Sequence, residues 1–254
     1  MLHLANVTLF AASSVAVPET VAALQRSCAN IEFGAIKFFC DVHPEGIKNT
    51  SIEWVKIAAL RSRQDYTRFI LKDLHNHINT DFALCVQWDG FILRPQAWRP
   101  QFLEYDYIGA PWPQFTDGWS VGNGGFSLRS ARLLRATADD SIPISDAEDV
   151  VICRTAREQL EQKFGIRYAP LSEASRFSCE RSELRGDEFG FHGVFNFSRL
   201  LGSEKLRATL NSVPIGMINM QDWWQMAKEA IAQRNFSLLL SLVQYLSRGI
   251  WKTT

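Results

Sequence analysis

The sequence lacks the features that would place it in several special classes of protein. Its 254 residues carry no net charge, because 27 basic residues balance 27 acidic ones. A general nucleic-acid binder needs an excess of positive charge to neutralise phosphates, so no nucleic-acid partner is expected. The chain has no run of 18 uncharged apolar residues, and therefore no membrane-spanning helix is expected.

Cysteine is scarce, and its spacing shows no pairing. The five cysteines are an odd number without a Cys-x-x-Cys pattern, which disfavours a disulfide framework and a zinc site. We expect reduced, mostly buried thiols and a cytoplasmic location. Met1 to Leu4 contain no lysine or arginine, so the basic start of a signal peptide is not found.

Apolar runs and helical stripes alternate along the first ninety residues. Runs at 6–12, 31–39 and 82–87 predict buried strands. Helices are predicted after Pro18 and after Asp65, which is expected to cap the second helix. The order strand, helix, strand, helix, strand is typical of an α/β fold with a mainly parallel sheet.

The second half of the chain is less regular. A short helix is predicted over 130–138, and a longer one over 145–164 with Gly165 as its stop. Residues 166–169 are expected to form a short strand. From about Ser198 the pattern is helical to the end of the chain.

Polar residues directly follow the third predicted strand. Gln87, Trp88 and Asp89 precede Gly90, at a strand end of the kind where such sheets bind ligands. A carboxylate there can hold Mg²⁺ or Mn²⁺ together with substrate phosphates, and Trp88 can stack on a base or sugar ring. Asp89-Gly90 is also typical of a hairpin turn, and spacing alone favours the turn.

A glycine-rich segment and an acidic pair come next along the chain. Asn123, Gly124 and Gly125 form a loop whose backbone can approach a sugar or phosphate closely, or simply a tight turn. Ser145-x-x-Glu148 fits a helix capping box, which gives Glu148 a structural explanation. Asp149 is either structural or a base that accepts a proton from a hydroxyl group.

Two other kinds of residue have alternative interpretations. His192, in the string Phe-Gly-Phe-His-Gly, is either a hydrogen-bonded structural histidine or a metal ligand. Arg129, Arg154 and Arg176 can each contact a diphosphate or an acidic acceptor, although each alone is expected to be a solvated surface residue.

Taken together, these segments resemble a bacterial family of glycosyltransferases of unassigned specificity, over residues 6–197. More distantly, they resemble the β-1,3-galactosyl-, N-acetylglucosaminyl- and Fringe-type transferases. The resemblance rests on six strings: VQWDGFIL (86–93), FLEYDYIGAPWP (102–113), VGNGGFSLRS (121–130), EDVVICR (148–154), RFSCE (176–180) and FGFHG (189–193). It implies a GT-A-like single nucleotide-diphosphosugar domain over 1–198, with a mixed, mainly parallel sheet flanked by helices. A C-terminal helical extension over 199–254 follows.

The resemblance also implies roles for the strand-end residues. Gln87-Trp88-Asp89 lies where these transferases have an Asp-x-Asp motif that holds a metal ion with the UDP diphosphate. Asp89 matches its last acid, whereas Gln87 replaces the first and brings no charge. His192 matches a late metal ligand. Together Asp89 and His192 would hold Mn²⁺ or Mg²⁺.

The remaining matches concern the donor and the base. Asn123, Gly124 and Gly125 join the strand-end residues as the expected donor-binding set. Glu148 and Asp149 match a catalytic acidic pair in which Asp149 is the base. The implied activity is transfer of a sugar, with inversion, from a nucleotide-diphosphate sugar to a hydroxyl of a glycan or lipid-linked glycan. The nucleotide is expected to be UDP, and the process polysaccharide biosynthesis.

The predicted C-terminal helix has two unlike faces. Leu239, Leu242, Val243, Leu246 and Ile250 form an apolar stripe, with Trp251 and Lys252 at the helix end. This stripe can pack on the domain, lie peripherally on the inner face of a membrane, or form a dimer contact.

Two other functions compete with glycosyl transfer. A sugar nucleotidyltransferase usually has a glycine-rich basic loop near its N-terminus, and Ala11 to Ser14 contain neither glycine nor lysine. A non-catalytic nucleotide-sugar or carbohydrate-binding protein is compatible with the missing acid at Gln87.

Overall fold

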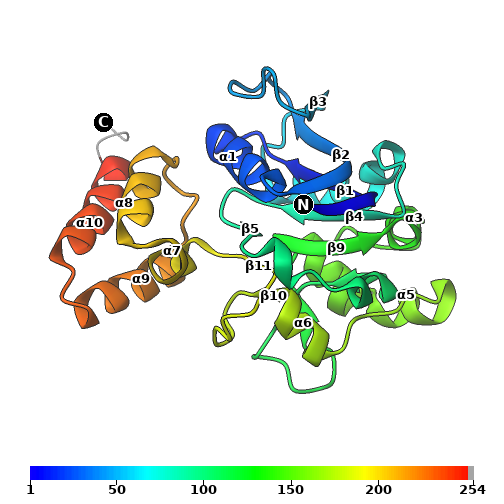
Figure 1. Ribbon diagram of the computed structural model, residues 1–254. Helices are drawn as coiled ribbons and strands as arrows, with labels where there is room; N and C mark the ends of the chain where they lie inside the picture. Colours follow the sequence, from blue (N-terminus) through cyan, green and yellow to red (C-terminus); the bar gives the residue numbers. More distant parts are fainter. Residues whose placement is uncertain (251–254) are drawn as a thin grey trace. The chain divides into compact units, whose positions relative to one another are not determined.

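The computed structural model describes residues 1–250, with side chains to residue 248, and it divides into two compact units (Figure 1). Unit 1 comprises residues 1–192 and unit 2 begins at Gly193. The sequence analysis places this division after Ser198. Trp251 and Lys252, which it assigns to the end of the last helix, lie outside the described residues.

Unit 1 is built on a six-stranded sheet in the order β3-β2-β1-β4-β9-β6. The first four strands in this order are parallel, whereas β9 is antiparallel to both of its neighbours. The expected mixed, mainly parallel α/β sheet is thus confirmed. The strands are β1 (Leu2–Ala12), β2 (Ile31–Cys40), β3 (Ile52–Lys56), β4 (Phe82–Val86), β6 (Tyr107–Ile108) and β9 (Phe126–Ser130).

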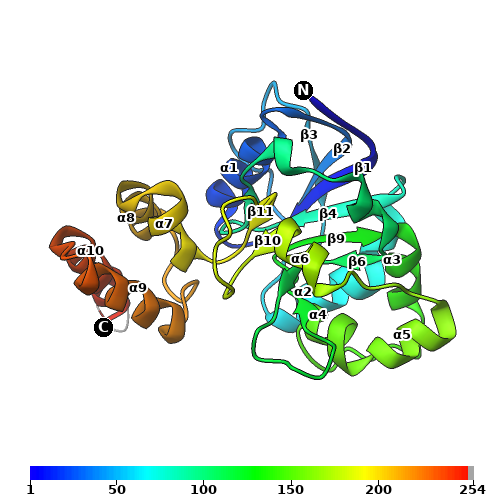
Figure 2. The same cartoon turned by 60° about the horizontal axis from the view of Figure 1, so that its bottom comes forward.

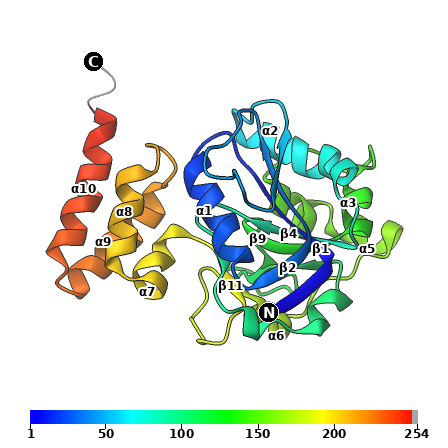
Figure 3. The same cartoon turned by 45° about the horizontal axis from the view of Figure 1, so that its top comes forward.

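Helices cover both faces of this sheet (Figures 2 and 3). Successive side chains of a strand point to opposite faces of the sheet. In β1, Leu9 belongs to the hydrophobic cluster that includes residues of α1 (Val17–Cys28), whereas the next residue, Phe10, belongs to a second hydrophobic cluster. The second cluster includes residues of α3 (Ala131–Ala138) and of a helical segment over residues 63–77. That segment consists of α2 (Arg63–Arg68), η1 (Phe69–Asp73) and η2 (Leu74–His77).

Two predicted local features are wrong. Ser62, not Asp65, caps α2: its side chain accepts a hydrogen bond from the Asp65 backbone N–H at 3.1 Å, while its own backbone is extended. Residues 166–169 form no strand, because only one bridge, between Tyr107 and Tyr168, is made there.

The helix predicted over 145–164 starts later than expected and is interrupted. Its parts are α4 (Glu148–Val150), the π-helical turn η5 (Val151–Thr155) and α5 (Arg157–Phe164). The predicted capping box is absent: Ala147 is the N-cap without a side-chain hydrogen bond, because the Glu148 side chain binds Arg129 instead. Gly165, with φ of 65°, ends the helix as predicted.

Two small sheets and several short helices complete unit 1. One sheet has the order β10-β11-β5, and the other pairs β7 with β8. Their strands are β5 (Phe91–Ile92), β7 (Ala110–Pro111), β8 (Val121–Gly122), β10 (Ser178–Cys179) and β11 (Gly190–Phe191). The short helices are η3 (Pro95–Ala97), η4 (Pro100–Glu104) and α6 (Leu171–Phe177).

Unit 2 is helical, as the sequence indicates. It contains η6 (Val194–Asn196), α7 (Phe197–Leu201), α8 (Ser203–Ser212), α9 (Met220–Ala232) and α10 (Phe236–Ile250). The Trp223 indole N–H donates to the Leu242 carbonyl at 2.9 Å, which ties α9 to α10. The predicted apolar stripe of α10 is divided, because Leu242 is buried and Val243 is exposed. Within residues 1–250, no helix has the length and hydrophobicity needed to cross a membrane.

All five cysteines are free thiols. Four of them are buried and Cys28 is partly buried, so the prediction of reduced, mostly buried thiols is confirmed. Burial raises the pKa of the Cys85 thiol to about 11, and a thiol that stays protonated is a poor nucleophile.

Candidate active site

The small sheet β10-β11-β5 brings Asp89 and His192 together, although they are far apart in the chain. In its antiparallel register Phe191 pairs with Phe91, so the residue after β11 meets the residues just before β5. As a result, His192 Nε2 lies 3.3 Å from Asp89 Oδ1. Both side chains are largely buried, at 18% and 12% exposed.

Asp89 sits at the corner of a tight turn. Gln87 and Gly90 exchange backbone hydrogen bonds of 3.1 and 3.0 Å, which leaves Trp88 and Asp89 as the two central residues. The turn expected from Asp89-Gly90 is therefore present, and it is what places the carboxylate against His192. Trp88 is only 9% exposed, so most of its ring is packed inside the protein.

His192 is held from both sides of its ring. Glu180 follows β10, and its Oε1 lies 3.2 Å from His192 Nδ1, while Gln87 Oε1 lies 3.3 Å from Nε2. Burial lowers the pKa of His192, but the carboxylates of Asp89 and Glu180 outweigh burial and hold it well above 6.5.

The glycine-rich loop before β9 contacts the same histidine. Asn123 has a left-handed backbone, with φ of 74°, and its Oδ1 accepts the Gly125 N–H at 2.8 Å. A Cβ on Gly125 would lie 2.1 Å from His192 Nε2, and one on Gly124 would lie 1.8 Å from Glu148 Oε1. Glycine is thus required here by close approach of protein side chains.

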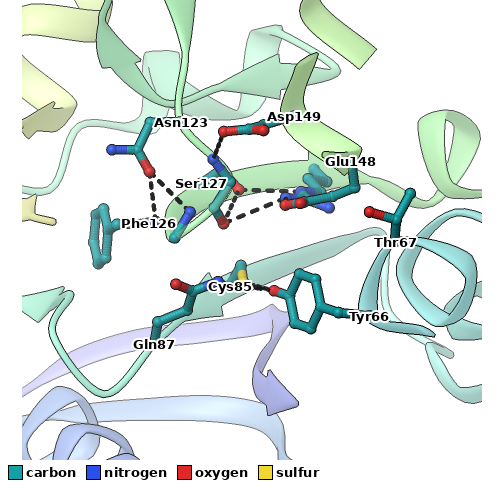
Figure 4. A network of polar contacts seen from close by, with 12 residues as sticks. Tyr66, Thr67, Cys85, Gln87, Asn123, Phe126, Ser127, Glu148 and Asp149 are labelled. Atoms are coloured by element: carbon teal, nitrogen blue, oxygen red, sulfur yellow. Dashed lines mark hydrogen bonds and ion pairs between the residues drawn. The ribbon is translucent and has the colours of Figure 1, made fainter. Parts of the chain in front are cut away.

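Asp149 contacts the same loop through a backbone N–H (Figure 4). Its Oδ2 accepts the Gly124 N–H at 3.0 Å, and its Oδ1 accepts the Val150 N–H at 2.8 Å. Burial, followed by the nearby charge of Glu148, raises the pKa of Asp149 from 3.8 to about 6. At neutral pH Asp149 is therefore an ionised carboxylate that is more basic than an ordinary aspartate.

Glu148 has a different environment from Asp149. Its Oε1 accepts a hydrogen bond from Arg129 Nη2 at 2.9 Å, and neither side chain is more than 6% exposed. Arg129 also donates to the Ser127 hydroxyl at 3.0 Å and to the Gly124 carbonyl at 3.3 Å. The expectation that Arg129 is a solvated surface residue is wrong, because β9 carries it into the interior beside this acid.

The structure thus gathers the predicted residues around one loop. Asp89 and Gln87 meet at His192, which lies against Gly125, and Asp149 accepts the N–H of the neighbouring Gly124. They meet because β9 is antiparallel to β4, so the start of β9 lies at the same sheet edge as the end of β4.

Two contributors were not predicted. Glu180 ends the string RFSCE but received no role, and no local pattern marks it as the partner of His192. The Tyr66 hydroxyl accepts a hydrogen bond from Gln87 Nε2 at 3.1 Å, and the sequence indicates only that the Tyr66 ring faces inward on a helix. Both contacts join residues that are distant in the sequence.

The side chains around His192 are the candidates for holding a divalent cation. Glu180 and Asp89 face opposite nitrogens of the His192 ring, so these three cannot share one ion, and among residues 1–250 no group of three or more His, Cys, Asp or Glu side chains is arranged as a metal site. Asp89, His192 Nε2 and the Gln87 amide oxygen do meet at one place. They fit a hard cation that takes its remaining ligands from substrate phosphates.

A comparison with protein-family models gives one match. Residues 49–192, more than half of the chain, match the family described as protein of unknown function (DUF5672). The chain belongs to the DUF5672 family. In this DUF5672 protein the matched segment ends at His192 and contains Asp89, the glycine-rich loop and Asp149. No curated protein matches the sequence.

Three solved structures show a distant similarity to this DUF5672 protein. A glycosyltransferase involved in glycosylation of the major capsid of PBCV-1 has 10% identity, covers 80% of this chain and 98% of its own, and has a TM-score of 0.48. The mannosyltransferase PcManGT of Pyrobaculum calidifontis, in complex with GDP-Man and Mn²⁺, has 9% identity, covers 98% of this chain and 88% of its own, and has a TM-score of 0.43. The glycosyltransferase GlyE of Streptococcus pneumoniae TIGR4 has 10% identity, covers 96% of this chain and 63% of its own, and has a TM-score of 0.45. Similarity of this degree says nothing about chemistry.

Proposed function

We propose that the protein transfers a sugar from a nucleotide-diphosphate sugar, UDP-linked, to a hydroxyl of a glycan or lipid-linked glycan. One observation carries the proposal: Asp89, His192 and Asp149 converge on the loop 123–125, although they are separated by up to about a hundred residues. This is the constellation implied by the resemblance of the sequence strings to glycosyltransferases.

The contacts across the loop form a continuous series. His192 Nε2 lies 3.3 Å from Asp89 Oδ1, and His192 Nδ1 lies 3.3 Å from Asn123 Nδ2. One residue further on, the Gly124 N–H binds Asp149. We assign the loop residues Asn123, Gly124 and Gly125, with Gln87, Trp88 and Asp89, to donor binding.

Asp89 and His192 would hold Mn²⁺ or Mg²⁺, with the Gln87 amide oxygen beside them. When bound, the cation would supply positive charge that offsets the charge developing on the leaving diphosphate. Gln87 adds no negative charge, so the site depends on the donor's own phosphates to complete the set of ligands. This agrees with the preference of Mg²⁺ for sites of one or two carboxylates plus phosphates.

Asp149 is the proposed general base. Its carboxylate takes the proton of the acceptor hydroxyl while that oxygen forms a bond to the anomeric carbon. The bond from the anomeric carbon to the diphosphate breaks, and its electron pair leaves with the phosphate oxygen. Attack from the face opposite the diphosphate inverts the anomeric configuration. The backbone N–H groups of Gly124 and Val150 fix the carboxylate, and each oxygen retains a lone pair for the proton.

Glu148 supports the site rather than reacting, since its carboxylate is buried against Arg129. Because Arg129 also holds the Gly124 carbonyl, the pair fixes the loop that Asp149 contacts. The resemblance had placed Glu148 in the catalytic pair with Asp149. We propose that this acidic pair divides into one base and one positioning residue.

The test is release of nucleoside diphosphate from a panel of nucleotide sugars with Mn²⁺ and simple glycan acceptors. Asp149→Asn is expected to keep the thermal stabilisation by the nucleotide but to lose turnover by about 10²–10⁴-fold. Asp146→Asn, an exposed carboxylate three residues away, is the matched control. Unchanged turnover in Asp149→Asn removes Asp149 from the mechanism.

The same panel separates the competing functions. A carbohydrate- or nucleotide-sugar-binding protein would be stabilised by a nucleotide sugar and release nothing. A sugar nucleotidyltransferase would instead release pyrophosphate from a nucleoside triphosphate and a sugar phosphate. Either result would replace the proposal.

A further inference from the structure

The outward side of α10 is apolar. Phe236, Leu240 and Val243 are 74%, 58% and 51% exposed. Their spacing of four and three residues places them on one face of the helix. On the opposite face Leu238, Leu242 and Tyr245 are buried in unit 2. The helix therefore has an apolar side that its own fold does not cover.

Two polar residues of α10, Ser237 and Arg248, also bond to other parts of unit 2, although Ser237 stays exposed. Ser237 accepts a hydrogen bond from Arg207 of α8, and Arg248 Nη1 donates to the Asn211 carbonyl at 2.8 Å. Arg248 also binds the carbonyls of Leu210 and Val213. These bonds hold the polar edge of α10 against α8 and its C-terminal end (Figure 1), and this leaves the apolar edge outside.

The neighbouring helix α9 also carries exposed apolar side chains. Trp224 and Ile231 are 54% and 59% exposed, and the Trp224 ring packs edge-on against the buried Trp223, with 5.0 Å between ring centroids. A tryptophan supported in this way presents a rigid apolar ring with one N–H, which suits the boundary between lipid and water. We call Trp224, Ile231, Phe236, Leu240 and Val243 the apolar face of unit 2.

The charge of unit 2 differs from that of unit 1. Residues 193–254 contain seven Lys or Arg and three Asp or Glu, whereas residues 1–192 contain 20 and 24. The zero net charge of the chain therefore conceals a basic unit that follows an acidic one. A basic unit with exposed apolar side chains complements an anionic lipid surface, whereas two copies of a basic unit repel each other.

We propose that the apolar face of unit 2 docks on an anionic lipid surface. The helices α9 and α10 then lie in the headgroup region, with the apolar face inserted and the basic side chains near lipid phosphates. This inference does not depend on the proposed chemistry. If that chemistry also holds, docking would bring the enzyme to a lipid-linked acceptor.

The experiment is co-sedimentation of the full chain with vesicles of phosphatidylcholine alone or mixed with phosphatidylglycerol. Binding is expected only to the mixed vesicles and should weaken as salt is added, because salt screens the basic residues. The triple variant Phe236→Ser, Leu240→Ser, Val243→Ser should lower the partition coefficient by at least about tenfold. Its melting temperature should stay close to wild type, because the three side chains are exposed.

A matched control removes exposed apolar side chains from unit 1. Val42→Ser and Leu171→Ser change residues that are 55% and 51% exposed, and they should leave vesicle binding unchanged. The proposal is overturned if the wild type does not bind mixed vesicles, or if the unit 1 control weakens binding as much as the triple variant. It is also overturned if sedimentation velocity shows that the triple variant converts a dimer to a monomer without changing vesicle binding.

Discussion

Removing the charge of Glu148 should destabilise the protein strongly, because it leaves Arg129 buried without a counter-charge. Arg129 is completely buried, and within residues 1–250 its Nη1 already has no hydrogen-bond partner. Breaking a buried pair by removing one partner costs about 3–5 kcal/mol. Glu148→Gln retains a carbonyl oxygen for Arg129 Nη2, so we expect the free energy of unfolding to fall by the lower end of this range, about 3 kcal/mol.

This loss converts to a fall in the melting temperature of about 6–12 °C for a unit of this size. The assay is thermal unfolding followed by circular dichroism. The matched control is Glu161→Gln, since Glu161 is 35% exposed and pairs with Arg157 at 3.0 Å. Such a pair contributes about 0–1 kcal/mol, so this control should shift the melting temperature little.

A double variant distinguishes the buried charge from other causes. Replacing Arg129 with Met and Glu148 with Leu removes both charges, and it should recover most of the stability lost in Glu148→Gln. Equal melting temperatures for Glu148→Gln and Glu161→Gln would refute the reasoning. Loss of turnover with an unchanged melting temperature would make Glu148 a reacting residue instead.

Four further outcomes follow from the site. Turnover should fall about tenfold per pH unit below about 6, where Asp149 becomes protonated; a flat profile would contradict its role as base. The folded protein binds this proton more tightly than the unfolded chain, so Asp149 lowers the free energy of unfolding as the pH rises from about 4 to 6. Asp149→Asn should make this decrease smaller, as measured by urea titration at each pH. Gly125→Ala should displace His192 and abolish metal-dependent turnover. Turnover at the wild-type rate in this variant would show that the close approach of Gly125 to His192 is not needed for activity. Glu180→Gln should weaken Mn²⁺ binding about 10–100-fold, measured by electron paramagnetic resonance; unchanged affinity would show that Glu180 does not position His192.

Local patterns were sufficient to predict the layered fold. The buried runs that became β1, β2 and β4 alternate with helices, and each element is defined by residues close together in the chain. The antiparallel direction of β9 could not be predicted in this way. Strand direction depends on which neighbour pairs with it, and that choice is made by contacts across the sheet.

The site shows the same limit. Asp89, Asp149 and His192 stand in short strings that are recognisable one by one, but their meeting depends on the register of β5 with β11. Glu148 looked like a capping residue because its local spacing fits one, and a tertiary contact with Arg129 replaced that role. In α10 the helical period was correct, whereas the side that faces inward depends on packing with the rest of unit 2, which buries Leu238, Leu242 and Tyr245.

The reversed strand β9 also determines which part of unit 1 is free for labelling. Because every catalytic candidate gathers where β4 ends and β9 begins, the far rim, at the turn of Ala29 and Asn30 and at Asp81, carries none of them. The five residues of β4 separate the two rims by roughly 17 Å. A fluorophore or an affinity tag inserted at residue 30 would report on the protein without standing beside the candidate site.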